Sequence, residues 1–147
     1  MTVPDNAALR DLALRVLAQH AGPAPDAAAV AAAARRAYDD LVRVSAPLIG
    51  TAGVEALTGR ALHLAKREYP RLAQTREPDQ AEGLFAQIVV DLGRQDPAAA
   101  TDAAIAVFAT FTRLLATFIG ESLTVGLLRK AWPGAFSDAS AWETEER

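Results

Sequence analysis

DPAAATDAAIAVFATFTRLLATFIG, residues 96–120, is the stretch of sequence that decides the fold class of this chain. Its large apolar side chains recur at the spacing of one helix face: Phe108, Phe111, Leu115 and Phe118. Asp96 is suited to cap the start of that helix, and Pro97 to its first turn, where no backbone N–H is needed. The opposite side carries mostly alanine and threonine. A helix that is apolar on nearly all sides is buried, so we predict a helical bundle packed around it.

Five further segments have the spacing of amphipathic helices, and no stretch alternates apolar and polar residues as a strand does. They begin and end near residues 5–20, 26–49, 51–69, 78–92 and 121–132. Glycine or proline separates each segment from the next. We therefore predict an all-α, six-helix bundle in which residues 1–133 form a single domain and residues 134–147 form a short acidic tail.

The chain matches itself when it is shifted by 70 residues. Three distinctive features then coincide: Asp26 with Asp96, Arg43 with Arg113, and the Ile-Gly pairs at 49–50 and 119–120. We interpret residues 5–70 and 78–133 as an internal repeat, two three-helix units related by a pseudo-twofold axis. The alternative is that two alanine-rich amphipathic segments align by coincidence.

Composition argues against several kinds of chemistry. The chain has no cysteine, which excludes disulfides, cysteine nucleophiles and thiolate-bound metals. Its two histidines, His20 and His63, lack the spacing of metal-binding motifs. Phosphate-binding glycine loops and the nucleophile elbow of hydrolases are also missing. These absences favour a non-catalytic protein that uses neither a metal nor a cofactor. Residue counting alone leaves a Ser–His–Asp triad open, but no spacing positions one.

Charge and hydropathy narrow the partners and the location. The net charge of −3 disfavours nucleic acid, and the turn near Gly50 is followed by few side chains that could read bases. Residues 103–128 are apolar but contain Arg113 and Glu121, so we expect a core helix and not an integral membrane span. The N-terminus has no signal-peptide pattern, and arginine and alanine usage suggests a bacterium, so we expect the cytoplasm.

A basic stripe marks a candidate ligand site on the third predicted helix. Arg60, His63 and Arg67 share one helix face, where guanidinium groups could hold a phosphate or a carboxylate. The alternative is an ordinary solvated face. Arg43 and Arg113 form a second candidate, a symmetric anion site near the pseudo-axis, unless they merely pack their stems and expose their charged ends.

Aromatic residues near the C-terminus are candidates for an interface. Trp132, Phe136 and Trp142 are large anchors of the type found at protein contacts, although they could equally complete the core. We therefore predict a non-catalytic regulatory or protein-interaction module that binds a protein partner or self-associates as a homodimer. The alternative function is a sensor or binding protein for a small anionic ligand, using the basic stripe or an apolar pocket between helices.

Overall fold

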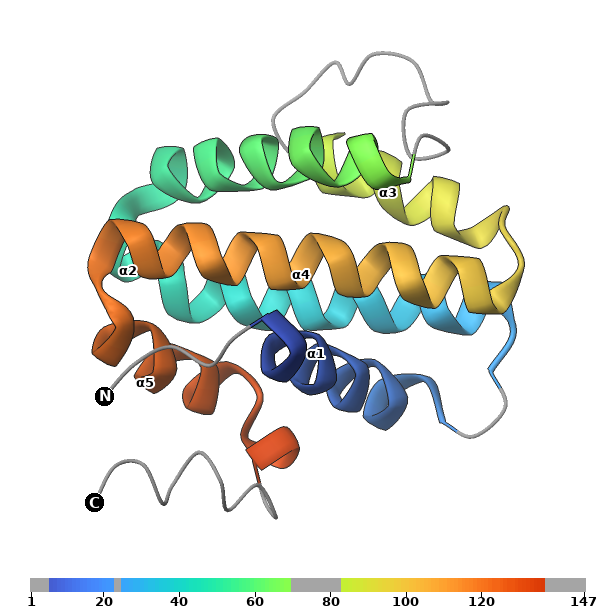
Figure 1. Ribbon diagram of the computed structural model, residues 1–147, viewed down its shortest axis with the longest axis horizontal. Coiled ribbons are helices and arrows are strands. Elements are labelled where there is room, and N and C mark those ends of the chain that lie inside the picture. The colour runs from blue at the N-terminus through green and yellow to red at the C-terminus, as the bar shows by residue number, and fades with distance from the viewer. Residues whose placement is uncertain (1–5, 23–24, 70–82, 137–147) are drawn as a thin grey trace.

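The computed structural model describes residues 6–22, 25–69 and 83–136, and the regular elements within these ranges are all helical (Figure 1). In chain order they are α1 (Asn6–Ala21), α2 (Ala27–Glu68), α3 (Gly83–Gly93), α4 (Pro97–Ile119), α5 (Glu121–Ala131) and the short 3-10 helix η2 (Pro133–Phe136). The prediction of an all-α fold is confirmed.

The number of α-helices in the described ranges is five and not the predicted six. The second and third predicted helices are one element, α2, which bends at Gly50 with φ 84° and ψ 158°. The sequence predicted a helix end at this glycine, but only this one residue leaves helical geometry, so no loop separates the two parts. Pro47 lies three residues earlier and lacks an N–H for the helical hydrogen bond, which favours a bend here.

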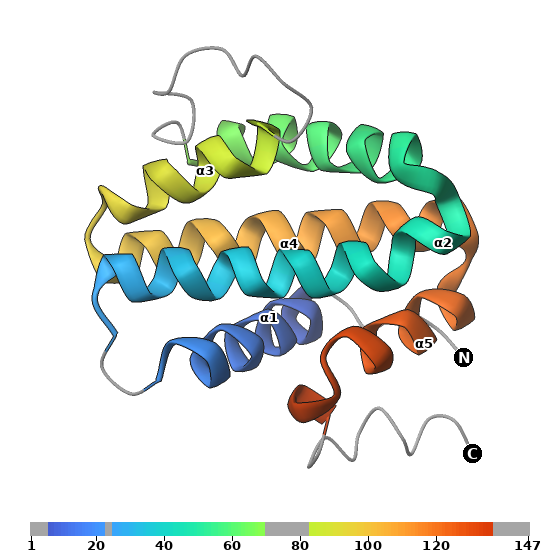
Figure 2. The ribbon, with the colours of Figure 1, turned by 180° about the vertical axis from the view of Figure 1, so that it is seen from behind.

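Two long helical segments form the centre of the bundle. The first part of α2 and the whole of α4 lie side by side and run in the same direction, from right to left in Figure 1. At the left-hand end both segments turn, and the second part of α2 and α5 lead back (Figures 1 and 2). α3 and α1 lie on opposite sides of this central pair.

The predicted helix starts and turns have the expected local geometry. The carboxylate of Asp26 accepts a hydrogen bond from the backbone N–H of Ala29 at 2.8 Å, and that of Asp96 accepts one from Ala99 at 3.4 Å. These bonds satisfy N–H groups that have no partner within the helix. Gly120, between α4 and α5, has φ 98° and ψ 157°, close to the values at Gly50.

A chain of aromatic rings crosses the core and joins α2, α3 and α4 to the residue that follows α5. Tyr38 of α2 stacks on Phe85 of α3 with centroids 4.1 Å apart, and Phe85 lies 5.9 Å from Phe108 of α4. The rings of Phe108 and Trp132, which follows α5, are nearly perpendicular, with centroids 5.8 Å apart. The indole Nε1 of Trp132 donates to the carbonyl oxygen of Ala37 at 3.2 Å. Offset and edge-to-face ring contacts add to the stabilisation that burial provides.

Small residues are frequent among the buried positions of the two central helices, which pack against each other. Six of these residues are alanines of α2 and α4: Ala33, Ala34, Ala37, Ala100, Ala103 and Ala104. Among the described helices, α4 is the one whose length and composition would also suit a membrane span. However, 56% of its apolar window is buried within the bundle, so more than half of this stretch packs against other helices.

Candidate functional site

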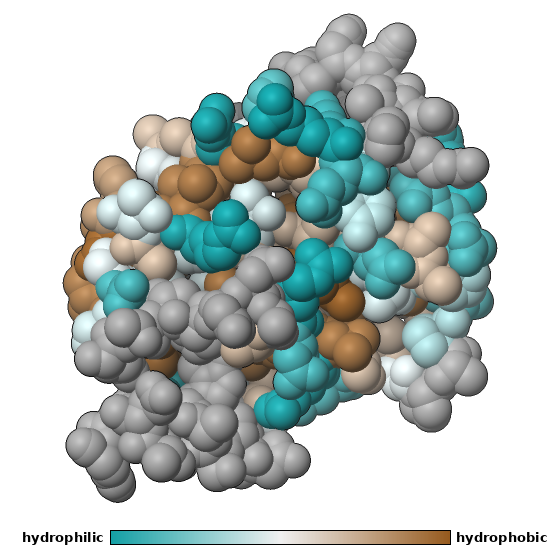
Figure 3. Space-filling view, viewed as in Figure 1, coloured by the Kyte–Doolittle hydropathy of each residue, from teal (hydrophilic) through white to brown (hydrophobic). Residues whose placement is uncertain are grey.

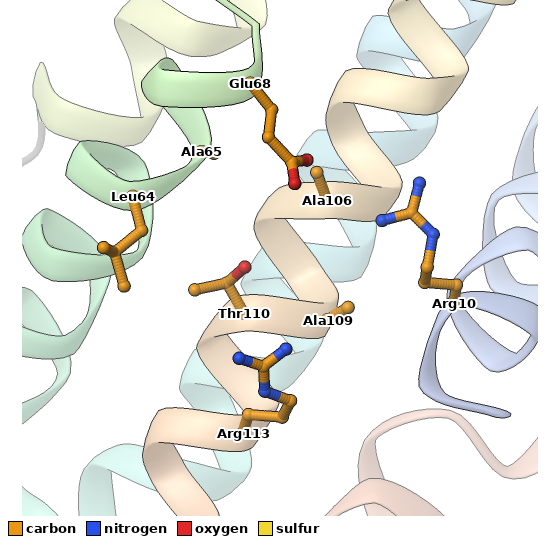
Figure 4. Close-up of a pocket in the computed structure, with 8 residues that line it drawn as sticks. All are labelled: Arg10, Leu64, Ala65, Glu68, Ala106, Ala109, Thr110 and Arg113. Carbon is orange, nitrogen blue, oxygen red and sulfur yellow. The ribbon is translucent and has the colours of Figure 1, made fainter. Parts of the chain in front are cut away.

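A cavity of about 180 Å³ opens between α1, α2 and α4 (Figure 4). It is lined by Arg10, Leu64, Ala65, Glu68, Ala106, Ala109, Thr110 and Arg113. Three of these residues are alanines, whose side chains end at Cβ and so leave the space open. The charged residues come from three different helices, which only the folded chain brings together.

Polar groups occupy two regions of this cavity. In Figure 4, Glu68 and Arg10 lie on opposite sides of Ala106, and the carboxylate and the guanidinium group both extend toward it. Farther along α4, the guanidinium of Arg113 extends toward Thr110. The arrangement can therefore present both positive and negative groups, together with a hydroxyl, to one small molecule.

The predicted pair of arginines is divided between two environments. Arg113 lines the cavity, whereas Arg43 is exposed on α2 and forms an ion pair with Asp40 at 3.1 Å. Asp40 also lies 3.9 Å from His20 of α1. Arg43 is thus paired with an aspartate of its own helix. It does not line the cavity that Arg113 lines.

The predicted basic stripe lies beside the cavity and does not line it. Arg60, His63 and Arg67 are exposed on the second part of α2. Helical geometry places them on the face next to Leu64 and Glu68, which do line the cavity. Within the described ranges, the structure shows no hydrogen bond or ion pair from the three stripe residues to another described residue. Their role in ligand binding stays a prediction.

Arg10 and Glu68 were not singled out from the sequence. Each is one charged residue among several on an amphipathic helix, and they are 58 positions apart in the chain. No spacing rule links residues on different helices, because their proximity depends on how those helices pack.

The structure places one of the three predicted aromatic anchors, Trp132. Trp142 and the side chain of Phe136 lie outside the part of the chain that the structure describes. Trp132 is 4% exposed and packs against Phe108, so the alternative interpretation, that it completes the core, describes its place. The sequence pattern, an aromatic residue before a proline, did not show whether Trp132 belongs to an interface or to the core.

An apolar surface lies instead at the end of the bundle where α2 and α4 turn. Phe118 is 64% exposed, Leu123 53% and Leu48 48%. Leu48 and Phe118 each stand two residues before a bend glycine, and Leu123 follows in the first turn of α5. Brown, apolar residues reach the surface at this left-hand end in Figure 3. We call Leu48, Phe118 and Leu123 the apolar end.

The chain segments that form the apolar end carry little charge. Residues 44–55 and 114–125 contain two charged side chains, Glu55 and Glu121. The stripe that runs through the buried Phe111 and Leu115 continues to Phe118, but α4 ends one residue later. Phe118 therefore lies at the C-terminal end of α4, where the buried stripe gives way to an exposed aromatic residue.

Other chemical features and comparisons add little to these two sites. Among the described residues, no group of three or more histidine, aspartate or glutamate side chains is placed to hold a metal ion. Burial raises the pKa of the Tyr38 hydroxyl, which is hydrogen-bonded to Thr58 Oγ1 at 2.7 Å within the bundle. Comparison with protein-family models, curated proteins and solved structures finds no match.

Proposed function

We propose that this chain is a non-catalytic protein-interaction module whose docking surface is the apolar end. The observation that carries the proposal is the exposure of Phe118, Leu123 and Leu48 at one end of the bundle, whereas the other large apolar residues that are exposed, Leu14 and Val90, lie on α1 and α3. Single exposed leucines are common on proteins, but grouped large apolar side chains mark contact sites. A partner that covers Phe118 gains an aromatic anchor of the kind that dominates binding energy at interfaces.

The charges around this surface indicate the kind of partner. Glu55 and Glu121 give the two segments a net charge of −2. An amphipathic helix that has leucine-type residues on one face and lysine or arginine beside them would match both properties. A membrane surface is a poorer match, because helices that bind lipid headgroups carry lysine and arginine on their polar face and this surface has neither.

The pseudo-twofold interpretation supports a docking surface built from two equivalent parts. With the exception of Ala31, every buried residue of α2 falls on a buried residue when the chain is shifted by 70 positions. The residues that end the two helical hairpins also have similar backbone angles: φ −129° and ψ 77° at Tyr69, φ −130° and ψ 61° at Trp132. In this interpretation Leu48 and Phe118 are equivalent residues.

Titration with a model peptide tests the proposal. The probe is a helical peptide of leucine and lysine, and its control has the same pattern with glutamate in place of lysine. We expect the lysine peptide to bind and the glutamate peptide to bind at least about tenfold more weakly. Phe118→Ser should weaken binding by about tenfold or more. The matched variant Leu14→Ser removes a leucine that is 45% exposed on α1 and should bind like the original chain.

Three results would overturn the assignment. Equal binding of both peptides, or equal weakening by Leu14→Ser and Phe118→Ser, would mean that the contact is nonspecific. Light scattering covers the other occupant, a second copy of this chain. If the unmodified protein is a dimer and Phe118→Ser is a monomer, the apolar end is a homodimer interface and not a surface for a basic helix.

A further inference from the structure

The cavity of Figure 4 has two polar ends separated by small apolar residues. Ala106 and Ala109 of α4 form its floor, and Leu64 of α2 lies on one side. Arg10 and Glu68 approach the floor near Ala106. A molecule lying along this floor would therefore meet a different set of charges at each of its ends.

The second end of the cavity is suited to an anion. Arg113 and Thr110 are three residues apart on α4, so they lie on one side of that helix. A guanidinium group holds a carboxylate through two parallel hydrogen bonds, and a hydroxyl can donate a third. On α2, the position equivalent to Thr110 is Asp40, which pairs with Arg43. α4 thus offers a donor where α2 has a carboxylate.

The first end of the cavity, near Glu68 and Arg10, offers a carboxylate that can hold a cationic group. The carboxylate of Glu68 can accept hydrogen bonds from an ammonium group, and Arg10 lies across the floor from it. A second negative charge on the ligand would be repelled by Glu68, and a ligand with only positive charge would be repelled by Arg10 and Arg113. The three charged residues sum to +1, so the cavity favours a carboxylate, and a ligand that also carries an ammonium group at Glu68 meets an opposite charge at each of its ends.

The size of the cavity limits the ligand to a small molecule. Its volume is about 180 Å³, which suits a ligand of a few non-hydrogen atoms. We propose that the cavity binds a small zwitterion of the amino-acid class, with its carboxylate on Arg113 and Thr110 and its ammonium on Glu68. This binding site is distinct from the apolar end, and neither depends on the other.

Titration with simple ω-amino acids tests this assignment. The probes run from glycine to 6-aminohexanoate, with butyrate and butylamine as singly charged controls, and backbone amide shifts of Ala109 and Thr110 report binding. We expect one of the zwitterions to bind at least about tenfold more tightly than butyrate, and butylamine to bind most weakly. The dissociation constant for so small a ligand should lie near about 1 mM or below.

Three variants separate the two ends of the site. Arg113→Gln should weaken binding of butyrate and of the best zwitterion alike, by about tenfold or more. Glu68→Gln should remove the advantage of the zwitterion over butyrate and leave butyrate binding unchanged or stronger. Arg60→Gln, on the exposed neighbouring face, is the matched control and should bind like the original chain. Glu68, Arg113 and Arg60 are all exposed, so these variants should remain folded.

The assignment is wrong if no probe shifts the amides of Ala109 or Thr110. It is also wrong if butyrate binds as tightly as every zwitterion, since Glu68 would then have no part in recognition. Equal weakening by Arg60→Gln and Arg113→Gln would show that the anion responds to overall positive charge and not to this cavity. Circular dichroism on each variant confirms that any loss of binding occurs in a folded chain.

Discussion

Gly120 gives a sharp test of the turns that define this bundle. It has φ 98° and ψ 157°, a region of backbone space that is essentially confined to glycine. A Cβ added there would meet no atom within 4 Å, so alanine would encounter no clash with neighbouring residues. The penalty would come from the backbone alone. We predict that Gly120→Ala lowers the free energy of unfolding by about 1–3 kcal/mol.

Gly126 is the matched control in the helix that Gly120 starts. It lies within α5, is exposed, and a Cβ added to it would also meet no atom within 4 Å. Glycine inside a helix is about 0.5–1 kcal/mol less favourable than alanine, so Gly126→Ala should stabilise the chain by that amount. The same chemical change is thus predicted to have opposite signs at positions six residues apart.

Urea denaturation followed by far-ultraviolet circular dichroism measures both effects. The midpoint should fall for Gly120→Ala and rise for Gly126→Ala, with the slope against urea unchanged. In thermal melts, each kcal/mol of change in the free energy of unfolding should shift Tm by about 2–4 °C. Gly50→Ala should resemble Gly120→Ala, because φ at Gly50 is 84° and ψ is 158°. A Gly120→Ala variant as stable as the original chain, or a destabilised Gly126→Ala variant, would refute the reasoning.

Three further substitutions test the core and the helix caps. Trp132→Phe should lower the free energy of unfolding by about 1–3 kcal/mol, because it leaves a void and removes the hydrogen bond to Ala37; urea denaturation measures it. Burial raises the pKa of Tyr38 above 10.0, so its contribution to stability is complete below pH 10.0 and is lost as pH rises through the raised pKa. Tyr38→Phe should therefore lose less stability than the original chain between about pH 9 and pH 11, as melts across that range would show. Asp96→Ala should lower the free energy of unfolding by about 1 kcal/mol, because α4 loses its N-terminal cap; the same urea assay measures this.

The sequence was a good guide to local structure. The apolar spacing in residues 96–120 predicted a buried helix, and Phe108, Phe111 and Leu115 are buried. Both aspartate caps could be predicted because a cap depends on a side chain and an N–H only three residues away. Such features involve neighbours in the chain, and their geometry is nearly independent of the rest of the fold.

Features that depend on packing could not be predicted. The sequence predicted a helix on each side of Gly50 and a boundary between two helices at this glycine, whereas the structure has one bent element, Ala27–Glu68, with Gly50 as its single non-helical residue. It predicted Phe118 as part of a core stripe, yet the stripe runs past the end of the packed region. Arg10 and Glu68 share a cavity because three helices meet there, and no residue spacing encodes that meeting.

The most direct test of the proposed function is a map of backbone amide shifts during titration with the leucine–lysine helical peptide. Docking at the apolar end predicts that the largest shifts fall at residues 48–55 and 118–125, around Leu48, Phe118 and Leu123. These shifts should disappear in Phe118→Ser. Shifts centred on α1 around Leu14, or shifts that persist in Phe118→Ser, would contradict the account.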